Sequence, residues 1–287
     1  MVHINETNMN FGNLPTEKSS SESAKVVIIP VLYGDPAVEE GRTSLGPDAI
    51  IKASGSLRFY DVDTDSDVSE IGIHTTEPIL ENDGVKVVET VHKTVLQFIK
   101  KKKFCVTLGG DHLVSLGAIR AHFNKYKDLT VIHFDAYPDM RPAHTRDITD
   151  HGCLMTRVRE MGSFIQIGIR GLNPDESHES IQDRIFYANR IHENRAWTHE
   201  MLNKLNANVY LSIDLQAFDP SLMPAVDAPL PGGLKWYQFM DILKQISEKS
   251  TLVGCDICGL SPIPGYNAPG HVAARLAYEV ITAKFFR

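Results

Sequence analysis

The amino-acid sequence predicts a single α/β domain of three layers, with a mostly parallel sheet between two layers of helices. Short runs that are apolar almost throughout alternate along the chain with segments of helical periodicity. Strands of this composition are buried on both faces, which is typical of parallel sheets covered by helices. The chain has 287 residues, of which 43% are hydrophobic, so it can fill one large core. No repeat, low-complexity linker or change in composition divides it.

The expected elements follow one another in order along the chain. Apolar runs predict strands at 25–32, 104–110, 129–136, 164–170, 209–215 and 251–257. Apolar residues spaced three and four apart predict helices at 85–99, 113–126, 151–161, 235–248 and 270–284. A loop rich in glycine, proline and acidic residues is expected at 33–50. The polar residues 1–24 are expected to form a flexible arm, so that 25–287 make up the folded domain.

Charge and composition exclude several classes of protein. The formal net charge is -7 and the main basic run is Lys100 to Lys103, so neither nucleic acid nor an anionic membrane is an expected partner. No apolar run reaches the roughly 18 residues of a membrane-spanning helix, and the N-terminus lacks the apolar centre of a signal peptide. We therefore expect a cytoplasmic protein. Cys255 and Cys258 have redox-motif spacing, but they lie where a predicted strand runs into a loop rather than at a helix N-terminus, so core cysteines are expected.

Side chains that can bind metal follow several of the predicted strands. The loops "GGDH", "DAYPD", "DLQAFDP" and "CGLSP" begin where strands end, and parallel strands bring such loops to one edge of the sheet. They contain His112, Asp135, Asp139 and Asp214. One aspartate alone is more often a turn residue, but an imidazole and three carboxylates together suit a divalent cation such as Mn²⁺. The sequence therefore predicts a metal site at this edge.

Longer stretches around these residues resemble the ureohydrolase family of arginase and agmatinase. The stretches are "TLGGDHLVSLGAI", "VIHFDAYPDMR" and "VYLSIDLQAFDPSLMPAVDAPLPGGL", and they match in order the family motifs GGDH, DAHxD and SxDxDxxDP. "EEGRTSLGPDAIIKAS" and "DHGCLMTRV" resemble agmatinase-type members, and the resemblance covers roughly residues 25 to 285. It implies an eight-stranded parallel sheet, a homo-oligomer (trimer or hexamer), and two Mn²⁺ ions whose bridging hydroxide attacks a guanidinium carbon.

The resemblance implies that half of this metal centre is lost. His112, Asp135, Asp139 and Asp214 match the ligands of the first ion. Two ligands of the second ion are replaced, a histidine by Tyr137 and an aspartate by Gln216. A phenol ligates well only as phenolate, and a glutamine carbonyl is a weaker ligand than a carboxylate. We expect one Mn²⁺ ion at most and leave open that there is none, or that Ca²⁺ or Mg²⁺ takes its place.

The resemblance also bears on catalysis and substrate recognition. Asp135 and His151 are the expected catalytic residues, because His151 matches a histidine that carries protons to the leaving amine. Gly259 replaces the glutamate that pairs with the substrate guanidinium in the family motif DxxExxP. Asp227, in the loop "PAVDAPLP", is hypothesised to supply the missing anion.

Two functions stay open on the sequence alone. One is a weak or altered metal-dependent hydrolysis of a C–N bond in a guanidino or amidine compound. The other is a catalytically inactive pseudoenzyme that binds a small molecule or regulates an active relative in a shared oligomer. Three further histidines lie on polar segments and are expected at the surface, namely His122, His178 and His199.

Overall fold

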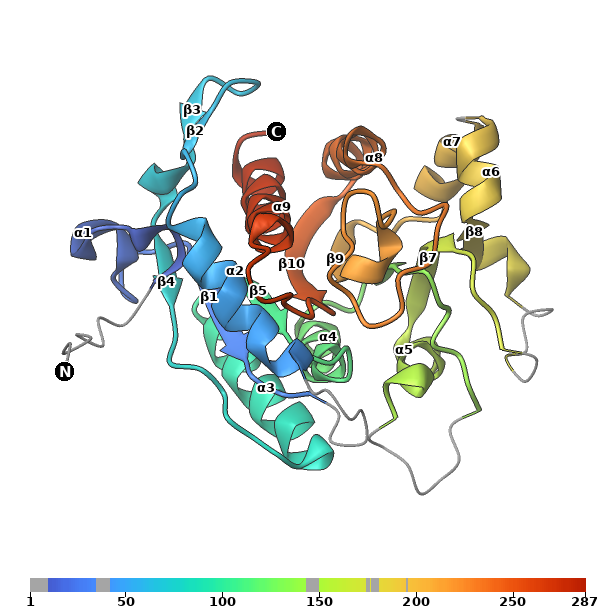
Figure 1. Cartoon of the computed structure of the whole chain (residues 1–287), viewed down its shortest axis with the longest axis horizontal. Helices are drawn as coiled ribbons and strands as arrows, with labels where there is room; N and C mark the ends of the chain where they lie inside the picture. The colour runs from blue at the N-terminus through green and yellow to red at the C-terminus, as the bar shows by residue number, and fades with distance from the viewer. Residues whose placement is uncertain (1–9, 35–41, 143–149, 174–175, 177–180, 195) are drawn as a thin grey trace.

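The central feature of the fold is one parallel sheet. The computed structural model describes residues 10–34, 42–142, 150–173, 176, 181–194 and 196–287. Within these residues eight strands form the sheet, and every neighbouring pair runs parallel (Figure 1). In sheet order the strands are β4 (Ile73–Thr75), β1 (Val26–Val31), β5 (Phe104–Gly109), β10 (Thr251–Cys258), β9 (Asn208–Asp214), β6 (Leu129–Phe134), β7 (Ser163–Ile169) and β8 (Ile185–Tyr187). The predicted eight-stranded parallel sheet is confirmed.

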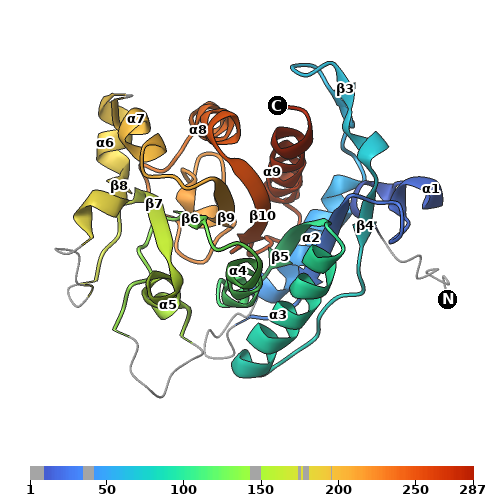
Figure 2. The same ribbon diagram turned by 180° about the vertical axis from the view of Figure 1, so that it is seen from behind.

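Helices cover the two faces of this sheet as two layers (Figures 1 and 2). One layer contains α2 (Gly46–Ser54), α6 (Ala188–Glu193), α7 (Ala196–Leu202), α8 (Trp236–Lys249) and α9 (Ala268–Phe285). The other contains α3 (Gly84–Lys100), α4 (Val114–Lys125) and α5 (Leu154–Met161). Strand residues alternate between the layers, since Val26 and Ile28 pack in the first core and Val27 and Ile29 in the second. The three-layer prediction is confirmed.

Short elements connect the strands and helices. They are α1 (Thr16–Ser19), the hairpin strands β2 (Tyr60–Asp61) and β3 (Ser66–Asp67), and the 3₁₀ turns η1 (Phe11–Asn13), η2 (Arg42–Leu45), η3 (Val68–Ile71), η4 (His151–Cys153), η5 (Gln182–Arg184) and η6 (Leu215–Ala217). The sequence pattern does not predict the edge strands β4 and β8, because three residues are too few to show a period. It is wrong about the end of the loop at 33–50, where α2 begins. Pro47 suits the first turn of that helix, and Ile50 packs into the core.

Part of the N-terminal segment packs against the domain. Residues 1–9 lie outside the described residues, whereas Phe11 is fully buried. The backbone nitrogen of Phe11 donates to Thr75 Oγ1 at 2.9 Å, and that of Gly12 donates to Ser54 Oγ at 2.8 Å. The described residues from 10 onward are therefore held to β4 and α2 rather than free. The domain boundary at residue 25 stays a prediction.

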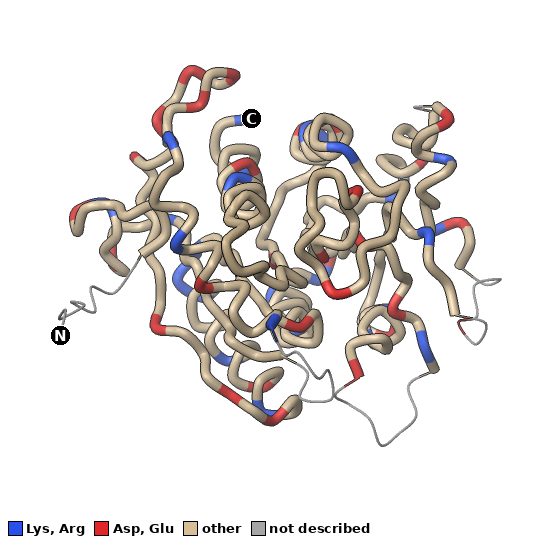
Figure 3. The backbone as a smooth tube through the Cα atoms, viewed as in Figure 1, with Lys and Arg blue, Asp and Glu red and all other residues tan. Residues whose placement is uncertain are grey.

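Charged residues, helix hydrophobicity and the cysteines bear on the classes of protein that the sequence excludes. Basic and acidic positions are interspersed along the described chain (Figure 3). Among the described helices, none is both long and apolar enough to cross a bilayer. Cys255 and Cys258 are buried, as predicted.

His122 is fully buried, so its predicted surface position is wrong. Its ring lies against Gly254 of β10, where an added Cβ would be 2.2 Å from Nε2, so α4 packs closely over that strand. His199 is exposed, and His178 lies outside the described residues.

Candidate metal centre

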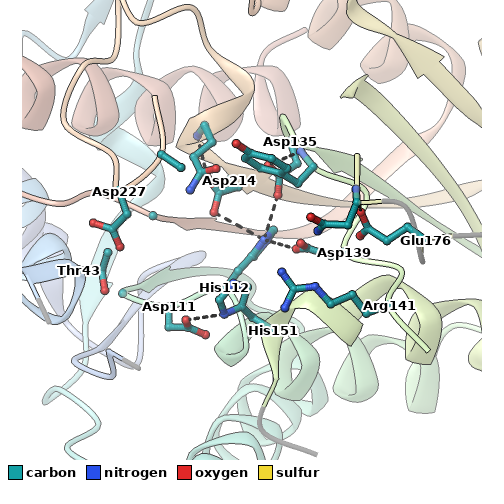
Figure 4. Close-up of a pocket in the computed structure, with 16 residues that line it drawn as sticks. Thr43, Asp111, His112, Asp135, Asp139, Arg141, His151, Glu176, Asp214 and Asp227 are labelled. Carbon is teal, nitrogen blue, oxygen red and sulfur yellow. Dashed lines mark hydrogen bonds and ion pairs between the residues drawn. The ribbon is translucent and has the colours of Figure 1, made fainter. Parts of the chain in front are cut away.

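The four predicted metal ligands meet at the carboxyl edge of the sheet. Nδ1 of His112 is 3.5 Å from Oδ2 of Asp135, 3.5 Å from Oδ2 of Asp139 and 3.7 Å from Oδ2 of Asp214 (Figure 4). All four side chains are buried. His112 follows β5, Asp135 and Asp139 follow β6, and Asp214 is the last residue of β9. These strands are not consecutive in the chain, but their carboxyl ends share one edge of the sheet.

Local backbone geometry aims these side chains at one another. His112 follows Gly110, where an added Cβ would be 2.1 Å from the carbonyl oxygen of Tyr33, so only glycine fits this approach. Asp139 has φ +50, a left-handed conformation that aspartate tolerates better than most residues, and it ends the turn that begins at Asp135. Asp214 caps η6, since its Oδ1 accepts from the backbone nitrogen of Gln216 at 2.7 Å.

The carboxylates and the imidazole perturb one another strongly. Burial alone raises the pKa of Asp214, and repulsion from Asp135 raises it further, well above its usual value. Burial also acts to raise the pKa of Asp135, but the imidazoles of His112 and His133 beside it outweigh burial and lower that pKa. Burial acts to lower the pKa of His112, but the surrounding carboxylates outweigh it and raise that pKa well above the usual range. Negative charge is therefore crowded here, and a cation would relieve the repulsion.

The site fits a divalent cation. Nδ1 of His112 is buried and has no hydrogen-bond partner, although it faces three carboxylates. Buried polar nitrogens are nearly always satisfied, so an unpartnered imidazole nitrogen amid carboxylates is the arrangement expected of a metal ligand. His112, His133, Asp135 and Asp139 offer ligand atoms that all lie within 4.8 Å of one another. The donor set of nitrogen and carboxylate oxygen suits Mn²⁺.

The positions of the second ion's ligands lie beside this cluster. Tyr137 and Gln216 both line the same cavity. The ring of Tyr137 packs against Gly171, where an added Cβ would be only 2.3 Å from Cε1. The Oδ1 atoms of Asp135 and Asp214, two of the predicted ligands, accept hydrogen bonds from backbone amides. Oδ1 of Asp135 accepts from the nitrogens of Ala136 (2.5 Å) and Tyr137 (3.1 Å), and Oδ1 of Asp214 accepts from Gln216.

His151 lines the cavity and is paired with a buried carboxylate. Its Nδ1 is 3.0 Å from Oδ2 of Asp111, which lies next to His112 in the chain. Burial acts to lower the pKa of His151, but the hydrogen bond and charge of Asp111 outweigh it and raise the pKa to about 10. The imidazole of His151 therefore holds a proton at neutral pH.

Gly259 and Asp227 also line the cavity. Gly259 has φ +87, and an added Cβ would be 2.7 Å from Oδ1 of Asp214. A side chain at this position would therefore be strained and would also collide with a predicted metal ligand. Asp227 is exposed, and Figure 4 places its carboxylate near Thr43.

The cavity is acidic and has a volume of about 340 Å³. Six carboxyl side chains line it, namely Asp111, Asp135, Asp139, Glu176, Asp214 and Asp227. The basic side chains on its wall are Arg141, His151 and His112. Carboxylates lie on opposite sides of the His112 cluster, since Figure 4 shows Asp227 on one side and Glu176 on the other. The cavity therefore favours a ligand with positive charge at more than one place.

Sequence reasoning missed several residues of this site. His133 lies in β6 two residues before Asp135, a spacing that points both side chains the same way and was a usable signal. Asp111 is adjacent to His112 and is given a role only by its contact with His151. Glu176 is buried and accepts from the backbone nitrogens of Met140 (3.3 Å) and Asn173 (2.7 Å). The sequence around Glu176 gives no comparable signal.

The chain is similar to known proteins over most of its length. Residues 24–283 match the sequence model of the Arginase family. The chain is 30% identical over 276 residues to an N(1)-aminopropylagmatine ureohydrolase of Synechocystis sp., covering 92% of this chain and 90% of that protein. It is 33% identical over 270 residues to a protein of the same name from Thermus thermophilus, covering 92% and 91%.

Solved structures show the same fold. The agmatine ureohydrolase of Thermoplasma volcanium superposes with a TM-score of 0.82 at 26% identity, covering 92% of this chain and 90% of that one. The proclavaminate amidino hydrolase from Streptomyces clavuligerus has a TM-score of 0.83 at 24% identity, covering 92% of each chain, and supports the fold alone.

Proposed function

The chain belongs to the arginase family, and from this premise we propose that it is a ureohydrolase-type protein that has kept one metal position and lost the other. It holds one Mn²⁺ ion with His112, Asp135, Asp139 and Asp214. With that ion it hydrolyses a guanidino or amidine C–N bond, at a rate lower than a two-metal centre would give or on an altered substrate. The observation that carries the proposal is the buried, unpartnered Nδ1 of His112 among three carboxylates.

The loss of the second position rests on the residues that stand there. Arginase-family proteins typically depend on Mn²⁺. Here Tyr137 packs on Gly171 and brings a phenol in place of an imidazole, and Gln216 brings an amide in place of a carboxylate. The Oδ1 atoms of Asp135 and Asp214 accept hydrogen bonds from backbone amides. A second dication would therefore find poor ligands at these positions.

The chain's own groups support a hydrolytic role around this ion. A bound divalent cation lowers the pKa of water and polarises the atom under attack. His151, held in its protonated form by Asp111, can give a proton to a leaving amine in the same cavity. The acidic walls attract a cationic substrate, and relatives at 30% and 33% identity are named for a guanidino polyamine. Asp227 is the proposed substrate anion in place of the residue absent at Gly259.

A catalytically inactive binding or regulatory subunit is the second candidate. The observation in its favour is Gly259, whose backbone conformation and closeness to Asp214 leave no place for a substrate-binding side chain. A member of this family that binds a cationic ligand without turning it over would keep the acidic cavity and lose this position.

We also propose a trimer or hexamer of identical chains in the cytoplasm, because arginase-family relatives are typically oligomers.

Metal content and turnover, measured on the same purified protein, distinguish these functions. The protein is loaded with Mn²⁺, dialysed and assayed for metal by mass spectrometry. Urea and ammonia release is then followed with agmatine, N(1)-aminopropylagmatine, arginine, guanidinobutyrate and formiminoglutamate. One ion per chain with slow release from at least one compound supports the hydrolase. One tightly held ion without turnover supports the inactive binder, and no metal at all contradicts the proposed metal centre.

Restoring the lost ligands provides a matched test. Tyr137→His combined with Gln216→Asp is expected to add a second Mn²⁺ ion and to raise the rate of urea release. The single variant Asp139→Asn is the control, because it removes a proposed ligand of the first ion and is expected to abolish tight binding. If the double variant bound no additional metal, the assignment of these two positions would be wrong.

A further inference from the structure

A row of buried polar residues crosses the sheet directly beneath the candidate metal centre. Five neighbouring strands each contribute one residue, and the row reads Thr107 (β5), Asp256 (β10), Ser212 (β9), His133 (β6) and Gln166 (β7). The strand register pairs each with the next, Thr107 with Asp256, Asp256 with Ser212, Ser212 with His133, and His133 with Gln166. All five side chains are 0–1% exposed. We call this set the polar row.

The polar row and the metal centre lie on the same face of the sheet. Successive residues of a strand point to opposite faces, so residues two apart point the same way. Asp214 lies two residues after Ser212, and Asp135 lies two residues after His133. Thr107 Oγ1, His112 Nδ1, His133 Nε2 and Gln166 Oε1 are the buried side-chain atoms of the described residues that lack a hydrogen-bond partner. All four belong to this row or to the histidine above it.

One end of the row determines which nitrogen of His112 faces the metal centre. The hydroxyl of Tyr210 donates to Oδ2 of Asp256 at 2.7 Å, and the hydroxyl of Ser212 donates to Oδ1 of Asp256 at 3.0 Å. A serine hydroxyl has one hydrogen, so Oγ of Ser212 can only accept in its remaining contact, which is with Nε2 of His112 at 3.0 Å. Nε2 of His112 therefore carries a hydrogen, and Nδ1 is the nitrogen available to a cation.

At the other end of the row, Gln166 determines which nitrogen of His133 carries the hydrogen, and the result differs from that for His112. Nε2 of Gln166 donates to the carbonyl oxygen of Pro138 at 2.6 Å. That carbonyl can only accept, so the orientation of the amide is determined, and its second hydrogen points to Nδ1 of His133 at 3.1 Å. Nδ1 of His133 is therefore an acceptor. The ring hydrogen is on Nε2, which faces Oδ2 of Asp135 (3.4 Å) and Oδ2 of Asp139 (3.8 Å).

We propose that the polar row gives different tasks to His112 and His133, whose rings are stacked with their centroids 5.1 Å apart. His112 binds the ion through Nδ1, whereas His133 is a positioning residue whose protonated Nε2 faces the carboxylates of Asp135 and Asp139 and which does not bind the ion itself. Coordination through Nε2 of His133 would require its hydrogen to move to Nδ1, where it would face the amide hydrogen of Gln166. The proposal rests on the metal centre proposed above and assigns it one nitrogen ligand.

Pulsed electron paramagnetic resonance of the Mn²⁺-loaded protein counts the directly bound nitrogens. We expect one bound nitrogen in the wild type, one in His133→Phe, and none in His112→Gln. The affinity of His133→Phe for Mn²⁺ should fall by about 10- to 100-fold, the usual effect of removing a residue that orients a metal ligand. His133→Gln keeps an N–H donor at a similar reach and should recover part of the affinity. Two bound nitrogens in the wild type, or loss of the nitrogen signal in His133→Phe, would overturn the proposal.

Two further measurements do not depend on the phenylalanine variant, and the second of them needs no metal. Gln166→Met keeps His133 and removes the amide that fixes its hydrogen, and it should lower Mn²⁺ affinity in the same direction. The ¹⁵N spectrum of the metal-free wild type should show His133 with an unprotonated Nδ1 and a protonated Nε2. A protonated Nδ1 overturns the proposal even if no Mn²⁺ binds, whereas failure to bind Mn²⁺ with the expected ¹⁵N pattern contradicts only the metal centre.

Discussion

Replacing Gly259 with alanine is predicted to weaken the metal centre, because it displaces Asp214 although it replaces none of the ligands. Gly259 has φ +87, and a Cβ built there would be 2.7 and 2.8 Å from the two carboxylate oxygens of Asp214. Gly265 is a matched control, because its φ of +79 is similar and a Cβ there would meet nothing within 4 Å. Both alanine variants incur the cost of a left-handed backbone, about 1–2 kcal/mol. Gly259→Ala incurs a further cost of about 1–3 kcal/mol, because Asp214 must move.

Urea denaturation of the metal-free proteins measures these free energies of unfolding, and titration calorimetry measures Mn²⁺ affinity. Gly265→Ala should bind Mn²⁺ as the wild type does. Gly259→Ala should bind it at least about tenfold more weakly, which corresponds to about 1.4 kcal/mol. Wild-type affinity in Gly259→Ala would refute the reasoning, because Asp214 would then not be the ligand that this glycine accommodates. The same geometry predicts that Gly259→Glu alone does not restore substrate binding.

Three further predictions concern the same cavity. Asp111→Asn should lower the pKa of His151 from about 10 toward the usual 6.5, as measured by NMR titration. Because folding raises the pKa of His151, the wild type should be more stable than this variant, and the difference should be largest below about pH 6.5. The difference should disappear as the pH rises through about 10. A difference that does not change with pH would contradict the pairing of His151 with Asp111. Gly171→Ala should destabilise the wild type, where its Cβ would be 2.3 Å from the Tyr137 ring, but not a Tyr137→Ala background, so additive effects in a double-mutant cycle would disprove that contact. Mn²⁺ at 100 times its dissociation constant should stabilise the fold by about 2.7 kcal/mol, and a melting temperature unchanged by chelation would contradict specific binding.

The sequence predicts the central sheet well because buried parallel strands have a strong apolar signal. Every residue of β1, β5 and β6 is buried, and each strand coincides with a predicted apolar run. The convergence of the metal ligands also follows from the sequence, since parallel strands end at a common edge. The edge strands β4 and β8 are different, because three residues paired on one side leave no periodic pattern.

The polar row could not be predicted, because it depends on the register between strands that are distant in the chain. Ser212 and His133 lie opposite each other on neighbouring strands, although 79 residues separate them by their numbers. Asp256 lies in a run that reads as an ordinary strand, and its partners Tyr210 and Ser212 become apparent only once β9 and β10 are paired. His122 has a polar local sequence, and only the packing of α4 over β10 buries it.

The number of Mn²⁺ ions that each chain holds tests the asymmetric metal centre most directly. Anomalous diffraction at the manganese edge from crystals soaked in Mn²⁺ would locate each ion. We predict a single peak among His112, Asp135, Asp139 and Asp214. A second, well-occupied peak a few ångströms away, beside Tyr137 and Gln216, would contradict the account.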